Sequence, residues 1–122
     1  MDTLEMKDKM RIVQELVPGR QITLAHIIAN PDPILYQKMG LDPKLDYNKA
    51  AIGVLTVSPA ETAVITADIA LKASGAELGF VDRFSGTLII TGTVSEVEAS
   101  FVAITDYFRN VLKFSVCDVT KT

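Results

Sequence analysis

The sequence has a single cysteine, Cys117, and a single histidine, His26, among its 122 residues. One cysteine excludes an intramolecular disulfide and fits a reducing cytoplasm. His26 stands among apolar residues with no second ligand at metal spacing, so we expect a buried, hydrogen-bonded histidine. Cys117 is likewise expected to be a small core residue. The sequence therefore predicts no metal site and no other cofactor.

Long apolar runs, a basic patch and a signal-peptide pattern are also missing from the sequence. Apolar stretches are interrupted by His26, Asp68 or Thr91 well before the roughly 18 residues that a membrane span needs. The chain has 12 basic and 15 acidic residues, a net charge of -3, so it offers no basic field for a phosphate backbone. The first nine residues mix both charges and do not predict a signal peptide. We expect a cytoplasmic protein that binds neither membrane nor nucleic acid.

No pattern in the chain indicates catalysis. There is no Gly-rich phosphate loop and no nucleophile elbow. The carboxylates of Glu61 and Glu98 are expected to cap helices, which leaves no acid–base pair. Arg83 lacks the phosphate-cradling loop and partner asparagine of an acylphosphatase-like enzyme. We therefore expect a protein that is not an enzyme.

Apolar residues, in contrast, are abundant. They make up 48% of the chain, although a protein of this length has much surface to cover. The length suits one domain with a single core. Buried interfaces between subunits are one outlet for excess apolar surface. The composition thus indicates a single domain that oligomerises.

The second half of the chain predicts the element order β-α-β-β-α-β. Short apolar runs bounded by turn residues predict strands at 51–57, 77–81 and 87–91, and period-two alternation predicts a last strand at 113–119. A polar turn, residues 82–86, joins the middle two strands. This order is that of the ferredoxin-like split β-α-β, an α+β fold whose helices cover one face of an antiparallel sheet.

Capping patterns mark the two helices between these strands. Ser58 and Glu61 form an expected capping box around Pro59, and Gly75 follows the first helix. Ser95 and Glu98 repeat the arrangement before the second helix. The apolar face expected of that second helix comprises Val97, Phe101, Ile104, Phe108 and Val111.

Further segments precede this core. Residues 22–29 are expected to form a strand, 33–39 a short helix and 43–49 a polar linker. Residues 11–17 also suggest a strand, but they end at Pro18-Gly19 and have nothing local to pair with. Because an isolated strand leaves its main-chain groups unpaired, several copies of this strand would solve the problem by closing into a barrel.

Three segments, residues 14–26, 51–56 and 79–86, together resemble the circularly permuted shell proteins of bacterial microcompartments (BMC). Residues 117–122 are also similar, so the resemblance covers nearly the whole chain in order. It points to the type found in ethanolamine- and propanediol-utilisation operons. Related shell proteins also serve choline and other substrates, so the metabolic compartment stays open.

The resemblance implies a non-catalytic homohexamer that tiles into facets around encapsulated enzymes. Its single domain, residues 1–122, would contain a permuted strand and helix at 20–40 and the ferredoxin-like core at 50–119. Expected partners are further copies of the chain and other shell proteins, with encapsulated cargo as an additional candidate. In such proteins the N-terminal strands of six chains form a β-barrel over the axial pore, which would assign this role to Arg11, Ile12, Val13, Gln14, Glu15, Leu16 and Val17.

The resemblance also implies roles for single residues. Lys72 occupies the position of a lysine at hexamer edges, and Asn30 stands where unpermuted relatives commonly have an edge arginine beside proline. Taken alone, Lys72 would be a solvated charge at a helix end, and Phe84 would be a packed hairpin aromatic. The pore loop of the family corresponds to Arg83, Phe84, Ser85 and Gly86.

The preferred function is thus that of a shell tile whose pore is capped. The alternative is a ring-forming, ferredoxin-like small-molecule sensor or small hydrolase.

Overall fold

The computed structural model describes residues 19–41 and 50–122 of the chain. The expected barrel strand at 11–17 and the expected linker at 43–49 lie outside the described residues. The described elements are β1 (Gln21–Ile28), α2 (Ile34–Lys38), β2 (Ala51–Ser58), η2 (Ala60–Thr62), α3 (Ala63–Ala73), β3 (Glu77–Asp82), β4 (Thr87–Gly92), α4 (Val94–Asn110), β5 (Ser115–Val116) and β6 (Thr120–Lys121). Within the described residues, each expected strand and helix has a counterpart, although the last strand is much shorter than predicted.

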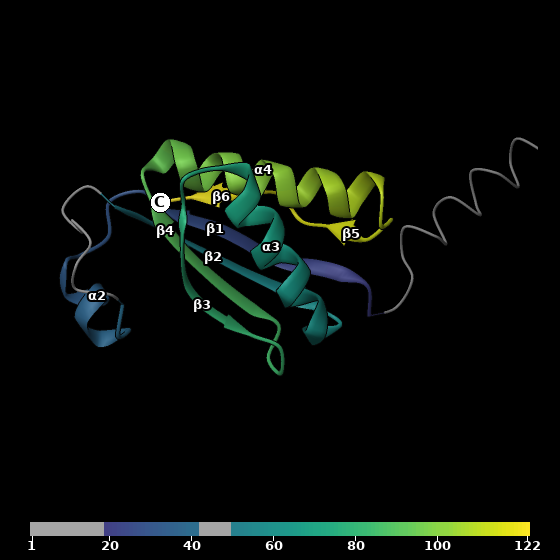
Figure 1. Ribbon diagram of the computed structural model, residues 1–122, viewed down its shortest axis with the longest axis horizontal. Coiled ribbons are helices and arrows are strands. Elements are labelled where there is room, and N and C mark those ends of the chain that lie inside the picture. Colours follow the sequence, from purple (N-terminus) through teal and green to yellow (C-terminus); the bar gives the residue numbers. More distant parts are fainter. Residues whose placement is uncertain (1–18, 42–49) are drawn as a thin grey trace, which may run out of the picture.

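The sheet has the order β3-β4-β2-β1-β5, with β6 also paired to β1 (Figure 1). Strands β3, β4, β2 and β1 are antiparallel to their neighbours, whereas β5 and β6 run parallel to β1. In a split β-α-β fold the last strand lies next to the first. Here β1 occupies that position beside β2. Of the strand predicted at 113–119, only Ser115–Val116 pairs with the sheet, because β1 already fills the place at β2.

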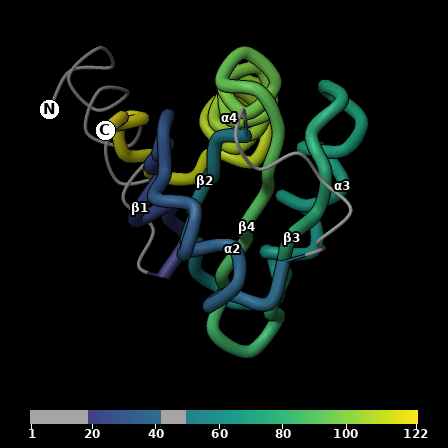
Figure 2. Tube along the Cα trace, turned by 90° about the vertical axis from the view of Figure 1, so that its left-hand side faces the viewer, coloured from purple at the N-terminus to yellow at the C-terminus, as the bar shows by residue number. Residues whose placement is uncertain are grey.

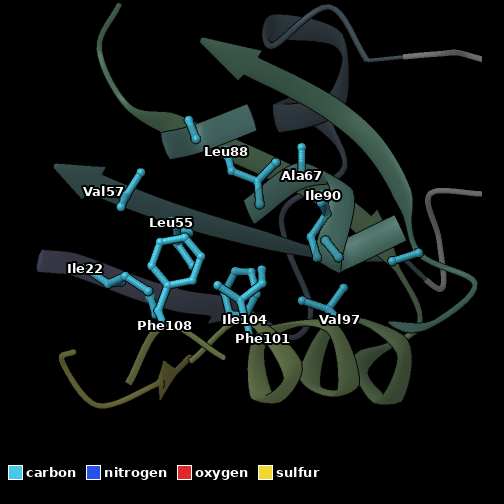
Figure 3. Packing of buried hydrophobic residues seen from close by; sticks show 14 of the residues in the cluster. Ile22, Leu55, Val57, Ala67, Leu88, Ile90, Val97, Phe101, Ile104 and Phe108 are labelled. Carbon is cyan, nitrogen blue, oxygen red and sulfur yellow. The ribbon is translucent and has the colours of Figure 1, made fainter. Parts of the chain in front are cut away.

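Helices α3 and α4 cover one face of the sheet and enclose the main core (Figure 3). From α4 the side chains of Val97, Phe101, Ile104 and Phe108 are fully buried. The fifth member of the predicted apolar face, Val111, is 58% exposed, because the helix has already ended at Asn110.

The other face of the sheet is covered in part by α2 (Figure 2). Tyr36 from this helix packs with Leu41 and Ile52 in a second, smaller apolar cluster. The Tyr36 hydroxyl donates a hydrogen bond to the carbonyl oxygen of Ala50. Both faces of the sheet therefore carry apolar packing, one beneath α3 and α4 and the other, in part, beneath the short helix α2.

Neither predicted capping box forms: the one before α4 is shifted by two residues, and the one before α3 is absent. The box at α4 is formed by Thr93 and Glu96: the Thr93 hydroxyl accepts from the Glu96 N–H at 3.1 Å, and the Glu96 carboxylate accepts from the Thr93 N–H at 2.9 Å. Ser95 lies inside the helix. Ser58 is still paired in β2 opposite Gln21, so its side chain does not cap, and the helical segment after it opens as a 3-10 turn without a side-chain cap.

Candidate pore turn and assembly surfaces

The turn between β3 and β4 is organised around the carboxylate of Asp82. One carboxylate oxygen accepts from the Phe84 N–H at 2.8 Å, and the other accepts from the Ser85 hydroxyl at 2.8 Å. These hydrogen bonds, that from the Phe84 N–H above all, lower the pKa of Asp82. The turn therefore has a defined internal structure, and an ionised Asp82 holds it.

Gly86 attaches this turn to the end of β2. Its backbone has φ +75°, and a Cβ built there would lie 2.2 Å from the carbonyl oxygen of Val57. The Val57 N–H donates to the Gly86 carbonyl oxygen at 2.8 Å. Only glycine allows this approach, because any side chain would meet main-chain atoms in a left-handed conformation that L residues rarely adopt. The position of the turn is thus fixed against the central strand.

Phe84 projects from the turn into solvent. Its side chain is 81% exposed, the most exposed of the large apolar residues that are described. The Arg83 guanidinium carbon lies 5.1 Å from the centroid of the Phe84 ring, within the range of a cation–π contact. Within one chain Phe84 is therefore not a packed hairpin aromatic. The turn presents an apolar ring and a positive charge together.

Lys72 and Asn30 lie at the end of the sheet opposite to this turn. Gly86 is beside Ala60, where the helical segment after β2 begins. Lys72 is in the last turn of α3, roughly the length of that helix away, about 16 Å. Asn30 follows β1, whose last residue, Ile28, pairs with Ile52 at the same far end. Figure 1 shows the β3–β4 turn and the C-terminal end of α3 at opposite ends of the domain.

Both of these residues are accessible. Asn30 is exposed, and the Lys72 side chain is 76% exposed while its amino group lies 2.9 Å from the Asp68 carboxylate. An exposed pair at this helical spacing contributes only a few tenths of a kcal/mol. Lys72 is therefore available for a contact outside the chain at little energetic cost.

A BMC domain model matches residues 51–120 of the chain. The chain belongs to the BMC shell-protein family. It is 44% identical to the shell protein PduU of Salmonella typhimurium over 92% of this chain and 93% of that protein. Identity is 44% to EutS of Escherichia coli K12, over 94% of this chain and 99% of EutS. It is 47% to CutR of Streptococcus intermedius, over 92% of each chain.

Solved structures agree with this assignment. A structure described as a CutR flat hexamer, form 2, superposes with a TM-score of 0.79 at 44% identity, covering 99% of this chain and all of that one. A fused, permuted hexameric shell protein from the RMM microcompartment gives a TM-score of 0.62 at 21% identity, over 71% of this chain and 45% of that one. The second likeness concerns the fold alone.

In this BMC chain His26 is hydrogen-bonded, as predicted, although it is half-buried rather than fully buried. Its Nδ1 lies 2.6 Å from the Thr120 hydroxyl and its Nε2 lies 2.9 Å from the Thr122 hydroxyl. Cys117 is half-buried, and burial raises the pKa of its thiol. Across residues 19–41 and 50–122, no three His, Cys, Asp or Glu side chains gather in a group able to hold a metal.

Glu61 and Glu98, the two carboxylates predicted to cap helices, have other surroundings. Glu61 is exposed in η2, and Glu98 forms an ion pair with Lys121 near the C-terminus. Among the described helices, none is both long and apolar enough to span a bilayer.

Proposed function

We propose that this chain is a structural subunit of a microcompartment shell, and that six copies form a ring that tiles with others into a flat layer. The observation that carries the proposal is the 44% identity to EutS over 99% of that protein's length, together with the full-length likeness to the CutR flat hexamer. Both cover the whole family domain and leave no large part of the chain unmatched. The proposed role of the protein is structural and not catalytic, and its proposed location is the shell of a compartment in the cytoplasm.

In this ring the β3–β4 turn surrounds the axis. Two features of the turn support the assignment: its fixed position against β2 and the exposed pair of Arg83 and Phe84. Six Phe84 rings would narrow the opening with apolar surface, while six Arg83 side chains would attract anions to it. Ser85 is exposed beside them, whereas Gly86 is buried and anchors the loop to β2.

In each of the six chains, residues 11–17 are proposed to form one strand of a small barrel over one mouth of the opening. This assignment rests on the family resemblance and the apolar pattern of the segment, together with the permuted order in which 20–40 precede the core. The test is solute flux through reconstituted layers of the full chain and of a variant lacking 11–17. We expect flux to rise on deletion, and a flux that rises little would contradict a capped pore.

Lys72 and Asn30 are proposed to lie at the outer edge of the ring. Their location at the end of the sheet opposite to the turn supports this, since a turn at the axis leaves that end directed away from it. We expect Lys72→Ala to leave the ring intact and to weaken layers seen by electron microscopy. Lys38→Ala, the same charge change on α2, is the matched control. Equal layers in wild type and Lys72→Ala, or equal loss in both variants, would reject the edge role.

The alternative of a ring-forming sensor or small hydrolase finds no support in the relatives. The mass of the purified full chain by light scattering, with negative-stain images, tests the main proposal directly. A mass of six chains and extended layers would support the tile. Trimers whose mass or shape changes with a small molecule would favour the sensor.

A further inference from the structure

The C-terminal residues Thr120–Thr122, here called the strap, are held along the outer side of β1. The Thr122 N–H donates to the Ile27 carbonyl oxygen at 2.9 Å, and the Ala29 N–H donates to the Thr122 carbonyl oxygen at 2.8 Å. These bonds continue the parallel pairing of β6 with β1. Figures 1 and 2 both show the yellow C-terminal segment beside the purple β1.

His26 holds the strap by two side-chain hydrogen bonds, here called the clasp. Its two ring nitrogens face the hydroxyls of Thr120 and Thr122, at 2.6 and 2.9 Å. A hydroxyl both donates and accepts, so each tautomer of the ring satisfies both bonds, with one nitrogen donating and the other accepting. Side chains two residues apart in a strand lie on the same face, which is why one histidine reaches both threonines.

The residue between these threonines secures the strap to a different element. Lys121 forms an ion pair with Glu98 of α4. Because neighbouring side chains in a strand alternate in direction, the strap is held by β1 on one side and by α4 on the other. It thus has two independent attachments besides its main-chain bonds.

The strap covers the C-terminal part of β1, which would otherwise be an open edge. On its inner side β1 pairs with β2 over its full length, but on its outer side the strands that it meets among the described residues are β5 and β6, of two residues each. Leu24, between these two contacts, is 41% exposed. An edge strand with free N–H and C=O groups beside apolar side chains is a template for pairing with a strand of another molecule.

We propose that the strap guards the β1 edge: clasped by His26 and by Glu98, it prevents β1 from pairing with a strand of a second copy of this chain. Its three residues are all exposed. A two-residue strand opens locally at much lower cost than the whole domain. The clasp therefore sets how often the edge is uncovered.

The test replaces the two hydroxyls by methyl groups in the double variant Thr120→Val, Thr122→Val, with Thr120→Ser, Thr122→Ser as the matched control that keeps them. Hydrogen exchange reports the Ala29 and Thr122 amides. Thiol labelling reports Cys117, which is unambiguous because the chain has one cysteine. We expect exchange and labelling about tenfold faster in the valine variant and near wild-type rates in the serine variant.

Sedimentation over a range of concentrations then tests the guarding role. The valine variant should form species larger than the wild-type assembly as concentration rises, while the serine variant should not. Unchanged exchange in the valine variant would refute the clasp, and faster exchange without larger species would refute the guard. Should the valine variant fail to fold, Lys121→Ala provides the same readouts by removing the Glu98 attachment, with Lys38→Ala as its control. Unchanged exchange in Lys121→Ala would then refute the Glu98 attachment, and faster exchange without larger species would refute the guarding role.

Discussion

Replacing Gly86 by alanine tests whether the turn is fixed by its contact with β2. Two separate costs arise. A left-handed conformation at φ +75° costs a non-glycine residue about 1–2 kcal/mol. The new Cβ would also lie 2.2 Å from the Val57 carbonyl oxygen and 3.1 Å from the Ala60 Cα. Both atoms belong to the main chain, so the turn or β2 must shift, at about 1–3 kcal/mol. Together these effects predict a destabilisation of roughly 2–5 kcal/mol.

Gly40→Ala is the matched control for Gly86→Ala. Gly40 also has a left-handed backbone, φ +67°, but a Cβ there would meet nothing within 4 Å. It should therefore lose only the conformational part, about 1–2 kcal/mol. Urea unfolding of both variants at one fixed protein concentration measures the difference, since the stability of an assembly depends on concentration. Losses that agree within about 0.5 kcal/mol would refute the steric contact of Gly86 with β2.

Further substitutions test the core, the cap and the turn. Gly53→Ala would place a Cβ 2.7 Å from the Val97 Cγ1 and 2.8 Å from the Phe101 Cζ and should destabilise by about 1–3 kcal/mol through overpacking; a urea midpoint equal to that of the wild type would reject this expectation. Thr93→Ala should cost about 1 kcal/mol of stability by loss of the cap, and Ser95→Ala less than about 0.5 kcal/mol. If thermal melts show a larger loss for Ser95→Ala than for Thr93→Ala, the helix begins at the residue expected from the sequence. The pKa of Asp82 is lowered in the folded state, so its stabilisation is complete above the ordinary aspartate pKa of about 3.9 and is lost as pH falls through the lowered value. The stability difference between wild type and Asp82→Ala should therefore shrink in acid, and a difference independent of pH down to 2 would contradict the role of the carboxylate.

Strands and helices with local signals could be predicted from the sequence. Residues 51–57, 77–81 and 87–91 were each correct to within one residue, because branched apolar runs between turn residues are a local property. The capping register failed for a local reason as well. Thr93 and Ser95 both stand three residues before a glutamate, and only the end of β4 at Gly92 decides which of them begins the helix.

Features that depend on distant residues could not be predicted. The alternation in 113–119 indicates a strand but not a partner, and the place beside β2 is taken by β1 from the other end of the chain. The hydrogen bonds of His26 join it to residues 94 and 96 positions away. The turn at 82–86 was predicted as a turn, whereas its attachment to Val57 and the exposure of Phe84 follow from packing that no local pattern records.

The two edges of the sheet differ in a way that suits a ring. Closing a ring head to tail requires each subunit to present two different surfaces. Any further unpaired sheet edge that could bind another chain would compete with ring closure. At one edge, β3 has no strand on its outer side among the described residues, and its Leu78 and Phe80 are 44% and 48% exposed. Leu71 of α3, a helix that packs against β3, is 44% exposed. At the other edge, β5 pairs with the start of β1 and the strap covers its C-terminal part. The β3 edge is thus open and partly apolar, whereas the strap withholds the C-terminal part of β1 from pairings that would divert subunits from the proposed ring.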